Sequence, residues 1–133
     1  MEHENRGLIS TFAHGVLDYF VGFALILAPN LLGFSDVGGA AEAVPRTLGF
    51  AILGMALLTD YELGVWKTIP FSVHKTIDFF AGIFLALSPF IFRFNWMDNN
   101  IWLPHVIVGA AIVIIGLFSA TRPHERLRHA HTH

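Results

Sequence analysis

Cysteine is absent from the 133 residues of this sequence. Without thiols the chain forms no disulfides, iron–sulfur clusters or thiolate-bound metal sites and performs no thiol redox chemistry. Charged residues are also scarce: they make up 14% of the chain, whereas a soluble domain carries roughly a quarter. The formal net charge of -2 is too small to indicate a strongly charged partner, and we expect no binding to nucleic acid.

The motifs of common enzyme classes are missing as well. The sequence contains no phosphate-binding loop, nucleotide-binding fingerprint or nucleophile triad, and it lacks the Glu-x-x-His pattern of di-iron helix bundles. The first residues, MEHENRG, lead to no small-residue cleavage site of the kind that ends a signal peptide. We therefore expect the first apolar segment to remain in the mature protein, and the sequence itself favours no enzymatic activity.

Apolar residues are abundant instead. The chain is 54% hydrophobic and includes 13 Phe and 3 Trp. A membrane-spanning helix needs roughly 20 predominantly apolar residues. The expected fold is therefore an all-α membrane protein with four transmembrane helices in the lipid bilayer, at residues 9–34, 44–59, 69–92 and 101–120.

The first apolar segment is duplicated. The stretch HGVLDYFVGFALILAPNLLGF, residues 14–34, returns sixty positions later as HKTIDFFAGIFLALSPFIFRF, residues 74–94. A match at a fixed spacing is the signature of a repeated structural unit. Because each copy carries two helices, both copies are expected to insert in the same direction, as parallel repeats. The ungapped alignment pairs His14 with His74, Asp18 with Asp78, Gly22 with Gly82, and Pro29 with Pro89.

The duplication predicts the organisation of the whole chain. We expect a polar arm at 1–8, a first two-helix repeat at 9–60, an inter-repeat loop at 61–68, a second two-helix repeat at 69–120 and a basic, histidine-rich tail at 121–133. The tail could bind metal adventitiously. Its histidines are His124, His129, His131 and His133. We expect the tail to be flexible and surrounded by solvent.

The duplicated segment resembles the SPW-repeat family of small bacterial and archaeal membrane proteins, named for a Ser-Pro-Trp motif in the first helix of each repeat. The matching residues are Ser88-Pro89-Phe90 in the second repeat and Ala28-Pro29-Asn30 in the first, so neither copy has the tryptophan. The resemblance covers residues 14–120 and also rests on the His-x3-Asp-x3-Gly pattern. It implies a pair of two-helix repeats, and it implies no catalytic residue and no substrate.

Each repeat places one histidine and one aspartate within its first apolar span. His14 and Asp18 are four residues apart and share a helix face, as do His74 and Asp78. Ionisable side chains in a membrane are costly and normally face the bundle interior, paired with one another. We therefore expect a single polar cluster between the first and third helices. Small residues and prolines are expected to let neighbouring helices pack closely, namely Gly22, Gly82, Pro29 and Pro89, together with Gly49, Gly54, Gly109 and Gly116.

Three interpretations of this cluster stay open. In the first, it fixes helix packing in a structural or interaction module, such as an accessory subunit of a homo-oligomer or a larger membrane complex. In the second, His14, Asp18, His74 and Asp78 bind a metal ion such as zinc, or the two histidines are axial ligands of a haem. In the third, the carboxylates carry protons or small ions. The sequence does not identify a cofactor, and an enzyme would require one.

The basic residues predict how the protein lies in the membrane. With four spans, both termini and the inter-repeat loop lie on one side, and that side holds most of the Lys and Arg residues. By the positive-inside rule, both termini face the cytoplasm of a multi-pass inner-membrane protein. The basic residues on this side are Arg6, Lys67, Lys75, Arg122, Arg126 and Arg128, against Arg46 and Arg93 on the other.

Residues at the ends of the spans carry weaker expectations. Pro45 and Pro104 suit the first turn of the second and fourth helices. Arg46 and His105 follow them directly, so we expect both side chains to contact lipid headgroups. Tyr61, in the inter-repeat loop, has no polar equivalent of its own type in the second repeat, and we interpret it as an anchor at the membrane interface.

Overall fold

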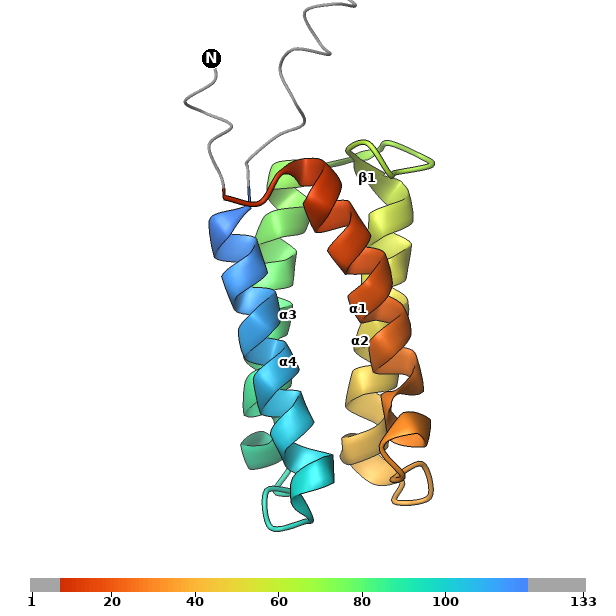
Figure 1. Cartoon of the computed structure of the whole chain (residues 1–133), viewed down its shortest axis with the longest axis vertical. Helices are drawn as coiled ribbons and strands as arrows, with labels where there is room; N and C mark the ends of the chain where they lie inside the picture. Colours follow the sequence, from red (N-terminus) through yellow and green to blue (C-terminus); the bar gives the residue numbers. More distant parts are fainter. Residues whose placement is uncertain (1–7, 120–133) are drawn as a thin grey trace, which may run out of the picture.

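The computed structural model describes residues 8–119, which form an antiparallel helical bundle. Within these residues the helices are α1 (Thr11–Leu31), α2 (Gly39–Leu58), α3 (Phe71–Ile91) and α4 (Asn99–Phe118), and the strands are β1 (Thr59–Asp60) and β2 (Ile69–Pro70). Each of the four helices is long and apolar enough to span a bilayer. α1 pairs with α2 and α3 pairs with α4, and the two pairs stand side by side (Figure 1). The expected all-α membrane fold with four spans is confirmed.

The second helix begins earlier than the apolar pattern predicted. α2 starts at Gly39, not at residue 44, because Gly38 has a positive φ of 71° that ends the preceding loop. Glu42 then lies in the first turn, where a negative charge is favourable near the helix N-terminus. As a result Pro45 falls in the second turn, and Pro104 in α4 does the same. Their expected placement in the first turn is wrong.

The displaced proline explains the position of His105. Pro45 has no N–H, so it cannot pair with the carbonyl of Ala41 one turn earlier. His105 of α4 fills this gap, with its Nε2 3.0 Å from the Ala41 carbonyl oxygen, while its Nδ1 lies 2.7 Å from the Ile101 carbonyl oxygen. Its side chain is buried. The expected headgroup contact of His105 is therefore wrong: it connects α4 to α2 inside the bundle.

Arg46 is also engaged inside the protein. Its Nη2 lies 3.0 Å from Glu42 Oε2, one turn earlier on α2, and its Nη1 donates to the Ile26 carbonyl of α1 at 2.7 Å. The charge of the arginine is thus neutralised by its own helix, and its side chain joins α2 to α1. The headgroup contact expected from the sequence stays a prediction, because the arginine side chain is still 27% exposed.

The first helix of each repeat ends in the same way. The backbone N–H of Phe34 bonds to the Pro29 carbonyl at 2.8 Å, and Phe94 bonds to Pro89 at the same distance. The residue before each phenylalanine adopts a positive φ: 79° at Gly33 and 59° at Arg93. This is a Schellman motif, which pairs the last carbonyls of a helix. Pro29 and Pro89 therefore lie in the last turn, and the left-handed residue four positions later ends each helix.

Glycines allow the two helices of each repeat to touch. A methyl group added at Gly49 of α2 would lie 2.6 Å from the Gly22 carbonyl oxygen of α1. Likewise, a methyl group at Gly109 of α4 would lie 2.6 Å from the Gly82 carbonyl oxygen of α3. Such small-residue contacts are a common basis of helix association in membranes. Gly54, in contrast, faces open space, so its expected packing role is wrong.

The apolar core joins all four helices at mid-height. Leu25, Val44, Ile52, Leu85 and Ile112 form one buried cluster drawn from every helix. A second cluster, containing Phe34 and Phe94, closes the end at which α1 and α3 finish. A third, containing Ala56, Tyr61 and Phe71, lies at the opposite end. We call this opposite end the β1–β2 end.

Short backbone pairings close the β1–β2 end with the sixty-residue spacing of the sequence repeat. Thr59 of β1 pairs in parallel with Ile69 of β2. Ile9, just before α1, forms a parallel bridge with Ser119, just after α4. The second helix of each repeat is thus tied to the segment that leads into the first helix of the other. α1 and α3 both begin at this end (Figure 1).

Candidate metal centre

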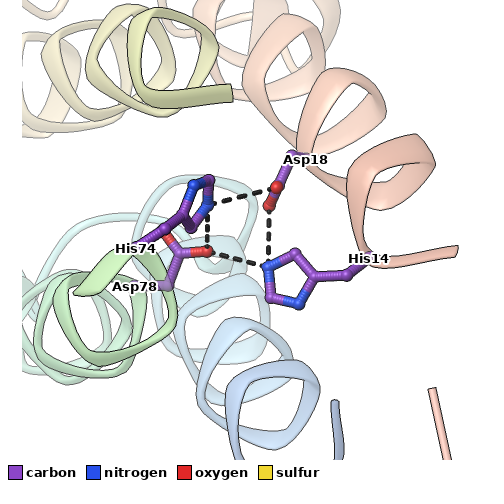
Figure 2. Close-up of side chains that lie close together, drawn as sticks. All are labelled: His14, Asp18, His74 and Asp78. Carbon is purple, nitrogen blue, oxygen red and sulfur yellow. Dashed lines mark hydrogen bonds and ion pairs between the residues drawn. The ribbon is translucent and has the colours of Figure 1, made fainter. Parts of the chain in front are cut away.

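The four ionisable residues of the duplicated segment meet near the β1–β2 end. His14 and Asp18 lie one turn apart on α1, His74 and Asp78 lie one turn apart on α3, and the side chains point toward one another (Figure 2). Both histidines are 0% exposed, and the two aspartates are 5% and 4% exposed. We call these four residues the His/Asp cluster.

Each imidazole in the cluster faces both carboxylates. His14 Nε2 lies 3.2 Å from Asp18 Oδ1 and 3.0 Å from Asp78 Oδ2. His74 Nε2 lies 3.1 Å from Asp18 Oδ2 and 2.9 Å from Asp78 Oδ2. One nitrogen or oxygen from each side chain lies within 4.8 Å of the others. The sequence indicated a pairing within each helix, and the structure adds an equally close pairing between the repeats.

Two hydroxyl groups hold the far sides of the imidazoles. Thr59 Oγ1 lies 2.5 Å from His74 Nδ1, and Ser119 Oγ lies 2.6 Å from His14 Nδ1. Each hydroxyl donates its only hydrogen to the carbonyl one turn earlier on its own helix: Thr59 to Met55 and Ser119 to Ile115, both at 2.5 Å. Each hydroxyl must therefore accept a hydrogen bond from the imidazole, so Nδ1 carries the proton in both histidines.

This hydrogen-bonding pattern determines what the centre of the cluster presents. A neutral imidazole protonated at Nδ1 has a bare lone pair at Nε2. If both imidazoles are neutral, their Nε2 atoms aim lone pairs at carboxylate oxygens; if they carry a second proton, Nε2 donates to these oxygens, as the geometry between His14 and Asp78 allows. His74 Nε2 is buried and has no partner in hydrogen-bonding geometry within the described residues. Its neighbours are carboxylate oxygens at 3.1 and 2.9 Å, so either a second proton on the imidazole or a bound cation is needed between these atoms.

Tyr61 makes the cluster asymmetric. It is 1% exposed, and its hydroxyl donates to Asp18 Oδ2 at 3.0 Å. Burial raises the pKa of Tyr61, and the nearby negative charge of Asp18 raises it further, so the phenol stays protonated and available as a donor. The residue sixty positions later is Thr121, outside the described residues. The expectation that Tyr61 is a membrane-interface anchor is wrong, because it lies inside the bundle.

Sequence reasoning missed three residues of this site: Thr59, Tyr61 and Ser119. Thr59 and Ser119 occupy equivalent positions in the repeat alignment, and both carry a hydroxyl. That match was the available signal for these two. For Tyr61, which has no equivalent tyrosine, the sequence offered no signal.

The described chain matches a family model. The model of the SPW repeat domain covers residues 12–119, which include all four members of the His/Asp cluster. The chain belongs to the SPW repeat family. Comparisons with curated proteins and with solved structures give no significant match.

In this SPW repeat protein, the motif positions themselves lie away from the cluster. Ser88 and Pro89 are buried in the last turns of α3, where the Ser88 hydroxyl donates to the Leu85 carbonyl at 2.7 Å. The equivalent residues of the first repeat are Ala28 and Pro29. The motif therefore belongs to the helix end, and the His/Asp cluster belongs to the helix start.

The space around the cluster bears on the cofactors considered from the sequence. The hollow beside Asp18 and Asp78 measures about 10 Å³ and is otherwise lined by aliphatic side chains. That volume suits about one water molecule, and neither histidine lines it, so the hollow lies beside the cluster and not at its centre. Phe71 closes the site, with its ring 5.0 Å from that of His14 and 5.8 Å from that of His74. A haem does not fit here, because its macrocycle would have to enter the space that the carboxylates occupy.

Proposed function

We propose that this SPW repeat protein is a membrane module whose two repeats are joined by a divalent metal ion bound to His14, Asp18, His74 and Asp78. The observation that carries the proposal is His74 Nε2, a buried nitrogen that faces two carboxylate oxygens without hydrogen-bonding geometry. A metal ion accepts lone pairs from both kinds of atom, so it would give His74 Nε2 and the two carboxylates a shared partner.

Charge balance supports the same conclusion. Two ionised carboxylates buried in a low-dielectric bundle are costly unless cations compensate them. A divalent cation with two neutral imidazoles makes the cluster electrically neutral. The hydroxyls of Thr59 and Ser119 already hold both histidines in the tautomer that metal binding at Nε2 requires. The hydrogen bonds that orient both histidine ligands are thus already in place without the metal.

The donor set favours a closed, structural site. Two nitrogens and two carboxylate oxygens suit zinc or another first-row divalent ion. Tetrahedral ligands at zinc bond lengths are separated by about 3.4 Å. Here the nitrogen–oxygen separations are 2.9–3.2 Å, and all four ligand atoms lie within 4.8 Å of one another. Four protein ligands leave no open position for a substrate, and a structural role is therefore favoured over catalysis.

A metal-free ion-pair lock is the second candidate. His14 Nε2 and Asp78 Oδ2, 3.0 Å apart, do have hydrogen-bonding geometry. If both imidazoles carried a second proton, two cations and two anions would form a neutral cluster and join the repeats without a metal. A relay for protons or ions is less favoured, because the described parts of α2 and α4 add no carboxylate at the depth of the cluster.

Metal analysis of the purified, detergent-solubilised full chain tests the proposal. We expect about one divalent ion per chain for a single four-ligand site. His74→Gln and Asp78→Asn should each lose most of this metal, because each removes one ligand while preserving size. Elemental analysis after gel filtration gives the stoichiometry. If the wild type held less than a tenth of an equivalent of metal after incubation with zinc, the metal proposal would fail and the ion-pair lock would be the better explanation.

Two controls separate this centre from other histidines. His105→Gln removes a buried histidine whose nitrogens both face backbone carbonyls, so it should keep the metal. A variant with the four tail histidines changed to Gln should also keep one equivalent. If the tail variant alone lost the metal, the bound ion would belong to the tail and the proposal would fail.

The membrane setting completes the proposal. We infer a multi-pass protein of the inner membrane, with the β1–β2 end facing the cytoplasm. Lys67 lies between β1 and β2 and Lys75 near the start of α3, while Arg93 follows the far end of α3. Exposed aromatic side chains on α1 and α3, including Phe20 and Phe80, support lateral packing against lipid, a second copy or a larger complex. An accessory role suits a module that has no open catalytic position.

A further inference from the structure

The described residues of the second repeat form a groove. It measures about 360 Å³ and lies between the start of α3 and the end of α4. Polar side chains line one part of it and apolar residues the other. The lining residues are Ser72, Lys75, Thr76, Phe79, Gly116 and Leu117.

The equivalent place on the first repeat is filled by the inter-repeat loop. Leu63 packs so closely on α1 that a methyl group added at Gly15 would lie 2.8 Å from its Cδ1. The hydroxyl of Tyr19 donates to the Leu63 carbonyl at 2.9 Å. The loop is also tied to α2, because the backbone N–H groups of Val65 and Trp66 bond to the Leu57 carbonyl. Gly15, Tyr19 and Leu57 align with Lys75, Phe79 and Leu117 of the groove.

The chemistry of the groove differs from that of its filled equivalent. Lys75 replaces Gly15, so a cation stands where Leu63 packs on the first repeat. Its Nζ donates to the Ser119 carbonyl at 2.7 Å, and no carboxylate of the described residues forms a salt bridge with it. The hydroxyl residues Ser72 and Thr76 lie on α3 together with Lys75, and Phe79 and Leu117 add apolar surface to the lining. A cation and hydroxyls next to an apolar floor form an amphipathic site.

We propose that this groove binds an anionic phospholipid, with its phosphate at Lys75 and the start of an acyl chain on Phe79 and Leu117. The groove lies at the end of membrane-spanning helices, where headgroups meet hydrocarbon. A basic residue at that level attracts anionic lipid. Lys75 is the charged residue among those that line the groove, so charge favours an anionic lipid as the occupant.

The site can be tested by native mass spectrometry of the full chain, released from vesicles of phosphatidylglycerol and phosphatidylcholine with identical acyl chains. We expect one phosphatidylglycerol to be retained in preference to phosphatidylcholine. Lys75→Gln should reduce this preference about fivefold, the effect of one basic residue near a membrane surface. Lys67→Gln, at the same end but outside the groove, should leave it unchanged.

A second variant tests the groove without altering charge. A side chain at Gly116 has room, since an added methyl group would meet no atom closer than 3.7 Å. Gly116→Leu should therefore fill the groove and release both lipids, whereas inorganic phosphate should compete with neither. Equal retention of the two lipids by the wild type, or an equal loss in Lys75→Gln and Lys67→Gln, would overturn the proposal. The result is independent of the metal content, which is measured on the same samples.

Discussion

At the scale of single residues, two helix-end hydroxyls determine the chemistry of the His/Asp cluster. Thr59 and Ser119 each bond back to their own helix and accept the Nδ1 proton of a histidine from the other repeat. Hydroxyls at helix ends usually serve the local backbone alone. In this protein the same groups also select the tautomer of a buried imidazole, so a local contact has a distant consequence.

Thr59→Val should weaken metal binding while leaving every proposed ligand in place. Valine keeps the shape of threonine but removes the acceptor at 2.5 Å from His74 Nδ1. Loss of an outer hydrogen bond to a metal-binding histidine typically weakens affinity about 10–100-fold. Titration with zinc in the presence of a competing chelator measures the change.

Thr68→Val is the matched control for that experiment. Its hydroxyl also bonds to a backbone carbonyl, that of Leu58, but it is exposed and lies away from the cluster. Its zinc affinity should equal that of the wild type. If the two variants bound zinc equally well, the hydroxyl of Thr59 would have no role in orienting His74.

At the scale of helices, close glycine contacts join the two helices within each repeat, and polar contacts join one repeat to the other. Gly22 with Gly49, and Gly82 with Gly109, bring the backbones of each helix pair together. The hydrophobic effect does not drive helices together inside a bilayer, so close van der Waals contacts dominate their association there. This packing within each repeat holds the helices that carry the cluster.

Gly109→Ala should destabilise the bundle, because the new methyl group would lie 2.6 Å from the Gly82 carbonyl oxygen, which cannot move independently of α3. Overpacking of this kind costs roughly 1–3 kcal/mol. Gly54→Ala, which meets no atom within 4 Å, is the control and should be neutral or slightly stabilising. Thermal unfolding in detergent compares the two, and equal melting temperatures would contradict the proposed contact.

At the scale of the whole molecule, the pairings at the β1–β2 end draw the two repeats into a ring of contacts. β1 joins β2 after the first repeat, and Ile9 joins Ser119 across the described ends of the chain. The His/Asp cluster lies just inside this closed end, beside the buried rings of Tyr61 and Phe71. The cluster is therefore shielded from the surface even though it lies in the first turns of α1 and α3.

A reporter-fusion experiment tests the orientation of this ring in the membrane. A reporter fused after His133 should be cytoplasmic, and reporters inserted after Asp36 or Met97 should be external, because basic residues are retained on the cytoplasmic side. Paired alkaline phosphatase and green fluorescent protein fusions give opposite signals on the two sides. If the Asp36 and His133 reporters lay on the same side, the four-span topology would be wrong.

The sequence by itself determined the spans, their number and the inward position of the charged residues. The physical reason is that the bilayer itself imposes these features. A helix needs about 20 apolar residues to cross it, and its hydrocarbon cannot solvate Asp18 or Asp78. The sixty-residue match also places His14 and His74 at equivalent positions of the two repeats. Helix starts were less predictable, because Gly38 and Glu42 moved α2 forward in a way that apolar periodicity does not register.

Only the tertiary structure decided which atoms face one another. Thr59 reaches His74, Ser119 reaches His14, and Tyr61 reaches Asp18, although these pairs are separated by 15, 105 and 43 residues. His105 of α4 likewise contacts the Ala41 carbonyl of α2, which has no helical donor because Pro45 lacks an N–H. Hydrogen bonds require partners within about 3 Å in a suitable direction. Such precision arises from how helices end and pack against each other, and composition and spacing do not encode it directly.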